Sequence, residues 1–159
     1  MDTNHKLPNA KAPDWSKSRA LRDVIQESDL HDFLLESIQL DVNFCAEALL
    51  SLRVPPSWFG VESVGWTDHW PYAHVRLSKI TKFTGTQFDL LDDGPAEIAG
   101  ASIRDGVTNS VIEMAIRGNR AEQSYGYDEG VSIEFSFSGD AVAAFSDRDG
   151  RVLEWPATK

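Results

Sequence analysis

The alternation of apolar and polar residues is strongest in the last third of the chain. Apolar side chains occupy every second position from Val131 to Phe137. This period of two is typical of a β-strand with one buried side and one solvent-facing side. Turn residues at 139–140 and 149–150 separate this segment from two further apolar segments, 141–145 and 152–155. The pattern predicts a meander of antiparallel strands at the C-terminal end.

Earlier in the chain, the same period predicts a β-hairpin made of residues 34–42 and 50–54. Leu34 and Ile38 are predicted to share the buried face of its first strand. Arg53 is predicted to lie on the outer, solvent-facing side of the second strand, because it falls between apolar positions.

Further strands are predicted at 73–77, continuing through 80–83, and at 98–103 and 111–116. Helical spacing of Leu21, Val24 and Ile25 predicts one short helix between residues 14 and 28. About eight strands with short turns and at most one N-terminal helix predict a mainly β fold. Its expected architecture is an antiparallel sandwich or a curled, partly closed sheet.

The domain organisation follows from length and from the composition of the N-terminal segment. Residues 1–14 are polar, contain two prolines and have no period, which predicts a flexible arm. Residues 15–159 are predicted to form a single β-rich domain, because a chain of 159 residues is long enough for one self-sufficient core.

The charge of the chain is strongly negative and unevenly distributed. The net charge is −10, and residues 1–22 carry +3, so the remaining residues carry −13. This balance argues against nucleic-acid binding and against anionic membrane surfaces, since both need Lys and Arg. It favours fast encounter with a basic partner.

The single cysteine, Cys45, excludes an intrachain disulfide and fits a reducing compartment. The N-terminal segment lacks the apolar core of a signal peptide, and no apolar run approaches the roughly 20 residues that span a bilayer. These features predict a cytoplasmic protein.

Histidines offer the only conventional metal-ligand chemistry. His69 and His74 are five residues apart, with Asp68 beside the first, and His31 is a further candidate. Zinc needs three or four such ligands, and an odd separation in an extended segment places two rings on opposite faces. No motif for a nucleophile or a phosphate-binding loop is present. We therefore predict no catalytic residue, no cofactor and no metal site.

Aromatic residues are concentrated between positions 58 and 72. Trp and Tyr often anchor protein interfaces, but in a small β-domain they also serve as a lid over the core. Acidic residues in the following turns would rim such a surface with negative charge. The predicted partner-binding residues are Trp58, Trp66, Trp70, Tyr72, Asp89, Asp92, Asp93 and Glu97.

Residues 29–41 resemble the start of many small bacterial domains of unknown function, in which a His-Asp pair precedes a strand containing Ser-Ile. Segments 75–83 and 130–135 are similar to their central and penultimate strands, so the resemblance covers residues 29–147. Several of these domains resemble immunity proteins of polymorphic-toxin systems. The resemblance implies a non-enzymatic β-rich binding domain and supplies no catalytic residues. His31-Asp32 is expected to bond to neighbouring backbone and fix the turn.

The leading hypothesis is an immunity-like protein that neutralises a cognate, toxin-like and basic protein by occluding it. The alternative is a small-molecule or carbohydrate-binding domain, or a weak hydrolase. In that case the aromatic residues between Trp66 and Tyr72 would stack on the ligand, and His69 or His74 would add polar contacts. A third possibility is a component of a larger assembly that docks through residues 1–22. The oligomeric state is left open.

Overall fold

The structure is a computed structural model that describes residues 13–41, 46–60, 69–85, 96–117 and 131–155. These residues form a ten-stranded antiparallel sheet and one α-helix, which confirms the predicted mainly β fold. The predicted flexible arm, residues 1–14, lies almost wholly outside the described residues. The strands are β1 (Arg19–Ala20), β2 (Leu34–Asp41), β3 (Glu47–Arg53), β4 (Tyr72–Leu77), β5 (Ile80–Gly85), β6 (Ala96–Asp105), β7 (Ser110–Arg117), β8 (Val131–Phe137), β9 (Ala141–Ser146) and β10 (Val152–Leu153). The helical elements are η2 (Trp15–Lys17), α1 (Leu21–Ser28) and η3 (Pro56–Phe59).

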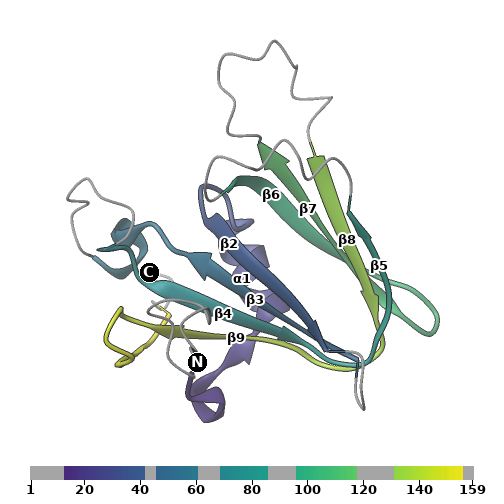
Figure 1. The fold of residues 1–159 in the computed structure, drawn as a ribbon, viewed down its shortest axis with the longest axis horizontal. Helices are drawn as coiled ribbons and strands as arrows, with labels where there is room; N and C mark the ends of the chain where they lie inside the picture. The colour runs from purple at the N-terminus through teal and green to yellow at the C-terminus, as the bar shows by residue number, and fades with distance from the viewer. Residues whose placement is uncertain (1–12, 42–45, 61–68, 86–95, 118–130, 156–159) are drawn as a thin grey trace, which may run out of the picture.

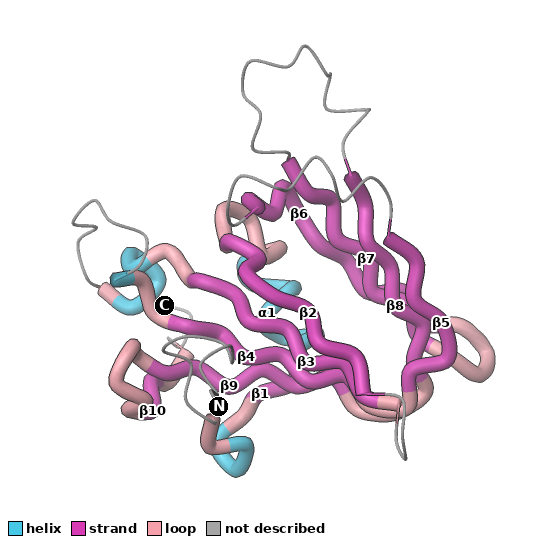
Figure 2. The backbone as a smooth tube through the Cα atoms, in the orientation of Figure 1, coloured by secondary structure: helices cyan, strands magenta, loops and turns pink. Residues whose placement is uncertain are grey.

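The strands follow the order β1-β9-β4-β3-β2-β6-β7-β8-β5, and β10 pairs with β9. The sheet has two halves, β1 to β2 and β6 to β5 in this order, which diverge in Figure 1 from the corner at the lower right. Only two residue pairs join β2 to β6, namely Leu34 with Glu97 and Leu35 with Ala96. The tube view shows the same curled sheet, with short loop segments joining strands of the two halves at that corner (Figure 2). The sheet is therefore curled without closing into a barrel.

At the corner, the segment that joins β4 to β5 lies beside the segment that joins β8 to β9. The Ser78 amide donates to the Asp140 carbonyl at 2.9 Å, and the Gly139 amide donates to the Ser78 carbonyl at 3.1 Å. A Cβ added to Gly139 would lie 2.7 Å from that carbonyl oxygen. Glycine is required here because two backbone segments approach too closely for any side chain.

The inner face of the sheet carries the hydrophobic core, and α1 packs on it. Leu21, Val24 and Ile25 are buried, as their helical spacing predicted. The helix contacts β9 of one half and β6 of the other. It is shorter than the segment with the predicted pattern, since it begins at Leu21 and ends at Asp29, whose backbone is left-handed. The helix thus bridges the two halves on the core side.

A β-bulge changes which residues of β2 face the core. Leu35 pairs with Leu52 and Ser37 pairs with Ser51, so Glu36 is the extra residue. An extra residue reverses the alternation beyond it. The prediction that Leu34 shares the buried face with Ile38 is therefore wrong, because Leu34 pairs with outward-facing Arg53 while Leu35 points inward.

The predicted C-terminal meander is only partly right. β9 pairs with β10, as the turn at 149–150 indicated, but β8 pairs with β7 and β5 and does not pair with β9. The residues between β8 and β9, 138–140, cross the corner of the sheet instead of closing a hairpin. Each strand is amphipathic, and that property alone does not decide its neighbours.

Candidate functional site on the outer face of the sheet

On the outer face of the first half, Arg53 holds a buried polar network, although it was predicted to be solvent-facing. Only 4% of Arg53 is exposed. Its Nε donates to Glu36 Oε2 at 2.8 Å, Nη1 to the Trp70 carbonyl at 2.9 Å, and Nη2 to the Tyr72 hydroxyl at 2.7 Å. The guanidinium also lies 4.0 Å from the centre of the Tyr72 ring. The prediction failed because alternation gives the face of a residue and not what covers that face.

Next to Tyr72, His74 is buried in its neutral form. Their rings stack with centroids 5.4 Å apart. His74 Nε2 and Ser146 Oγ lie within hydrogen-bond distance, at 3.3 Å. Burial lowers the pKa of His74 to about 4, and burial likewise raises the pKa of Tyr72. The histidine and serine are both nearly inaccessible, and no carboxylate is paired with this imidazole among the described residues. The pair therefore packs as part of the network and is poorly placed to attack a substrate.

Three buried polar side-chain atoms in the described part of the chain have no hydrogen-bond partner: Ser37 Oγ, Trp70 Nε1 and Arg76 Nε. By strand register, Ser37 and Arg76 both lie on the outer face of the first half, on β2 and β4. Trp70 adjoins the same face, since its carbonyl accepts from Arg53. All three atoms can donate a hydrogen bond. Orphan donors of this kind are uncommon in buried positions.

The outer face of the second half of the sheet carries three glutamates, and by register it also carries Lys82 of β5 and Arg104 of β6. Glu113 of β7 and Glu134 of β8 are directly opposite each other in the register. Glu97 of β6 lies on the same face, because its neighbour Ile98 is buried in the core. Arg104 contacts Glu113 at 3.5 Å, with more than half of the arginine side chain exposed. We name Glu97, Glu113 and Glu134 the acidic face.

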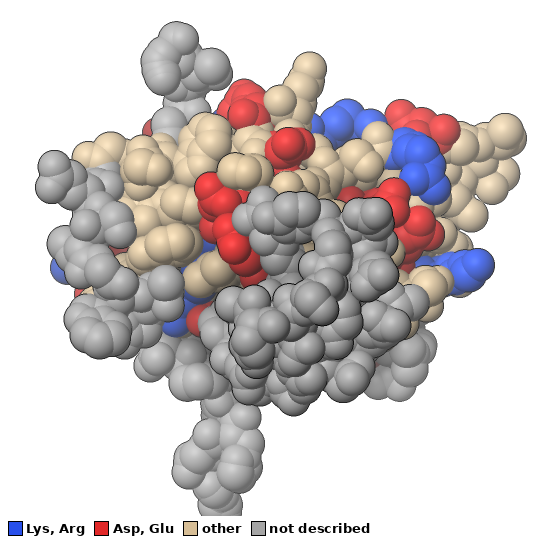
Figure 3. Space-filling view, turned by 90° about the horizontal axis from the view of Figure 1, so that it is seen from above, with Lys and Arg blue, Asp and Glu red and all other residues tan. Residues whose placement is uncertain are grey.

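Acidic residues are also widespread on the surface as a whole. In the view from above, Asp and Glu side chains lie in several groups, and Lys and Arg side chains lie mainly toward one end (Figure 3). The view fits the net charge of −10.

The predicted partner-binding residues that the structure describes do not gather at one place. Trp58 stacks on Trp155 with ring centroids 5.0 Å apart, so it packs against the core. Tyr72 is buried beneath Arg53. Of the others, Trp70 is half-buried beside the Arg53 network and Glu97 is part of the acidic face. The remaining four, Trp66, Asp89, Asp92 and Asp93, lie outside the described residues.

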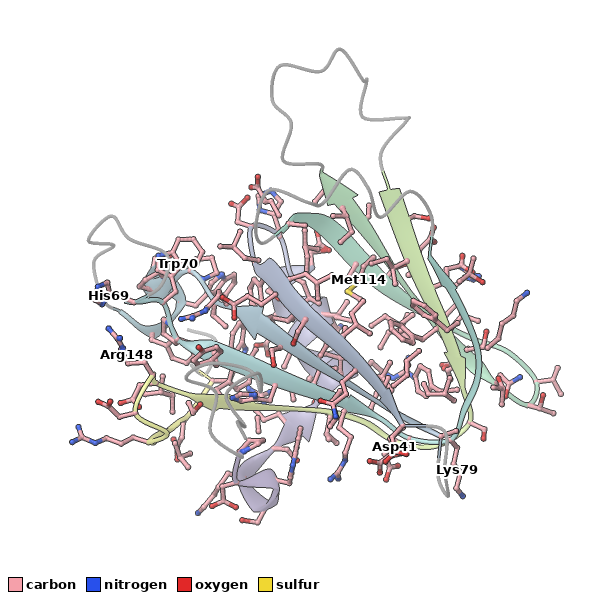
Figure 4. All side chains as sticks on the ribbon, viewed as in Figure 1. Asp41, His69, Trp70, Lys79, Met114 and Arg148 are labelled. Carbon is pink, nitrogen blue, oxygen red and sulfur yellow. The ribbon has the colours of Figure 1, made fainter. Side chains whose placement is uncertain are left out.

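The candidate histidines have separate partners. His69 Nδ1 accepts from Arg148 at 2.9 Å, at the opposite end of the molecule from Asp41 and Lys79 (Figure 4). His31 Nδ1 lies 3.2 Å from Asp32, and both side chains are about half exposed. Across the described ranges, no group of three or more His, Cys, Asp or Glu side chains is arranged to hold a metal.

The turn containing His31 and Asp32 is fixed differently from what the sequence predicted. The side chain that bonds the backbone is Ser28: its hydroxyl donates to the Val24 carbonyl and accepts from the Leu30 amide. The side chains of His31 and Asp32 bond to each other instead. The turn is strained, because Asp29, Leu30 and Asp32 all have positive φ.

Sequence reasoning did not single out Glu113, Glu134 or Arg76. Each occupies a polar position in an alternating strand, as dozens of surface residues do. Only the pairing of β7 with β8 brings the two glutamates together, and only the fold places Trp15 over Arg76.

Comparisons of the chain with protein-family models, with curated proteins and with solved structures found no match. None of the helices in the described ranges is long and apolar enough to cross a membrane.

Proposed function

We propose that this chain is a non-enzymatic binding protein that occludes a basic surface of a cognate protein. Immunity proteins neutralise toxins in this way, and a basic, toxin-like partner is the one we propose. Occlusion needs no reacting group on this chain. It needs a surface whose shape and charge complement the partner.

The observation that carries the proposal is the direct opposition of Glu113 and Glu134 on the outer face of the sheet, where both residues are partly exposed. Like charges opposite each other on neighbouring strands destabilise a sheet. A basic partner would relieve that repulsion on binding. On the same face, the flanking rows of the register pair Val111 with Ser136 and Ala115 with Ser132, and the flexible Arg104 side chain contacts Glu113. The acidic face is therefore accessible to long Lys and Arg side chains of a partner.

The predicted aromatic anchors have a different place in this proposal. Trp58 and Tyr72 support the fold through their packing. The contribution of Trp66, Trp70 and the acidic residues at 89, 92 and 93 to the partner surface stays a prediction. The alternative, a small-molecule or carbohydrate binder or weak hydrolase, becomes the preferred reading if the test below finds no protein partner.

The test is co-expression of the tagged chain with its native gene neighbours, followed by purification and calorimetry of the complex. We expect a basic protein in stoichiometric amount, bound more weakly as salt is added, since salt screens exposed charges. The double variant Glu113→Gln/Glu134→Gln should raise Kd about tenfold or more, equivalent to roughly 1.4 kcal/mol.

A matched control removes the same charge elsewhere. Asp23→Asn/Glu154→Gln changes two exposed acids on α1 and near the C-terminal end of the described chain. This control should leave Kd within about threefold of the unmodified chain, because charges far from an interface act only through the screened field. Equal losses for both double variants, or the absence of any basic partner, would rule out the acidic face as the binding surface.

A further inference from the structure

Arg76 is a partly buried cation with no counter-charge among the residues that the structure describes. It lies on the outer face of β4, where Leu49 and Val142 are its cross-strand neighbours. Its guanidinium carbon sits 4.6 Å from the centre of the Trp15 ring. The Nε atom is buried and has no hydrogen-bond partner, and no carboxylate within the described residues pairs with the guanidinium.

This lack of a partner is unusual for two reasons. Arginine is rarely buried without a partner, because removing its charge from water costs free energy. The chain also holds 25 acidic residues, so carboxylates are abundant. The other arginine of this face, Arg53, is bonded to Glu36. Arg76 thus differs from Arg53 in having no carboxylate partner among the described residues.

We propose that Arg76 and Trp15 form a binding site for an oxyanion, a carboxylate or phosphate group of a ligand. A guanidinium has a planar edge of N–H donors that matches two oxygens of such a group. Stacking on Trp15 occupies one face of the plane, while Nε–H, which belongs to this edge, has no partner among the described residues. The stack also fixes the orientation of the fork before the anion arrives, which lowers the entropy lost on binding.

The surroundings of Arg76 support an anion more than a structural role for its charge. Leu49 and Val142 supply apolar neighbours that exclude water and strengthen a charge-assisted hydrogen bond. Ser37 and Trp70, the other residues with orphan polar atoms, are donors associated with the same outer face. A face with orphan donors and no orphan carbonyl or carboxylate among its described side chains calls for a ligand with acceptor atoms.

This site is independent of the proposed function. A basic partner on the acidic face would meet Glu113 and Glu134 on the second half of the sheet, whereas Arg76 lies on the first half. The two sites also select ligands of opposite charge. If binding at one of the two sites is disproved, binding at the other can therefore still be tested.

The experiment is a titration of the full chain with sodium phosphate, and separately with sodium acetate, followed by NMR of the arginine Nε–H groups. Sodium chloride at matched ionic strength is the reference. Burial of Arg76 Nε slows exchange of its hydrogen with water, so its resonance is observable. The matched internal control is Arg53, whose Nε belongs to a buried residue and is already bonded to Glu36.

We expect the Arg76 Nε–H and Trp15 indole resonances to shift and saturate with phosphate, acetate or both, with a Kd on the order of 1–10 mM. The Arg53 Nε–H resonance should drift only with ionic strength. Arg76→Lys keeps the charge without the fork and should weaken binding severalfold, as should Trp15→Leu.

The arms of the titration also identify the ligand chemistry. Saturation with phosphate alone assigns a phosphate group, and saturation with acetate alone assigns a carboxylate. If the Arg76 resonance shifts no more than that of Arg53, or responds equally to chloride, the proposal is wrong. This result comes from the unmodified chain, so it stands even if a variant fails to fold.

Discussion

Nε of Arg53 donates a 2.8 Å hydrogen bond to Glu36, the residue that a β-bulge adds to β2. Because Leu35 points inward, alternation already places Glu36 on the outer face, beside Arg53. The bulge keeps the next residue, Ser37, on that face as well. Without the carboxylate, a guanidinium that is 4% exposed would have to give up its water with one hydrogen-bond partner fewer.

Removing the Arg53 side chain should therefore destabilise the fold strongly. Arg53→Met leaves the Glu36 carboxylate and the Tyr72 hydroxyl without their donor, and breaking such a buried pair costs about 3–5 kcal/mol. Urea unfolding at pH 7 measures the loss. Arg22→Met is the control, because the Arg22–Asp105 pair is mostly exposed and should change the free energy of unfolding by less than about 1 kcal/mol. Equal effects of the two substitutions would contradict a buried network.

The close backbone approach at the corner of the sheet leads to a second prediction, which rests on steric contact alone. A Cβ on Gly139 would lie 2.7 Å from the Ser78 carbonyl oxygen and 2.8 Å from Ser78 Cβ. Gly139→Ala should cost roughly 1–3 kcal/mol, the range for overpacking. Gly100→Ala is the matched control, since nothing lies within 4 Å of its added Cβ. If Gly100→Ala lowered the free energy of unfolding as much as Gly139→Ala, the close approach at the corner would not be what limits stability.

His74 should make stability depend on pH in the acid range. Burial lowers its pKa from 6.5 to about 4 in the folded chain. Between these values the unfolded chain binds the proton more readily, so the free energy of unfolding falls as pH decreases from 6.5 toward 4. The loss from this group reaches roughly 3 kcal/mol at its low-pH end.

The measurement is urea unfolding of the unmodified chain and of His74→Phe at several pH values from 7.5 to 4. Carboxylates contribute to both proteins and cancel in the difference. The stability advantage of the unmodified chain should shrink as the pH drops through this window. A difference that stays constant with pH would mean that His74 is not held neutral by burial.

The two opposed glutamates of the acidic face should lower the free energy of unfolding of the unbound protein. Glu134→Gln removes the like charge opposite Glu113 and should raise the free energy of unfolding by about 0.2–1 kcal/mol at low salt. The gain should largely vanish in 1 M salt, where the screening length is about 3 Å. Glu154→Gln, an exposed acid outside the sheet, should give no such salt-dependent gain. Destabilisation by Glu134→Gln at low salt would argue that the two glutamates do not repel each other.

Much of the local structure follows from residue order. The apolar residues of β7 and β8 alternate, and Ile112 and Phe135 are buried as that alternation predicted. The helix also buries the three residues that its spacing indicated. These predictions succeed because the side-chain period of a strand or helix depends on backbone geometry alone.

The candidate site depended on contacts between distant segments. Glu113 and Glu134 are 21 positions apart in the sequence, and nothing in either segment states that they are neighbours. Trp15 and Arg76 are farther apart still, and Trp58 has an aromatic partner, Trp155, from the C-terminal end of the described chain. The aromatic cluster was recognisable in the sequence, but its exposure was not.

The sequence by itself determined a mainly β chain with a negative surface and one short helix, because periodicity and net charge are properties of residue order. The tertiary structure decided which strands are neighbours, where the sheet bends and which polar residues are buried. The bulge at Glu36 and the corner at Gly139 arise from backbone hydrogen bonds between remote strands. Such bonds involve groups that every residue carries, so side-chain identity does not specify their partners. The acidic face and the Arg76–Trp15 pair are consequences of that pairing.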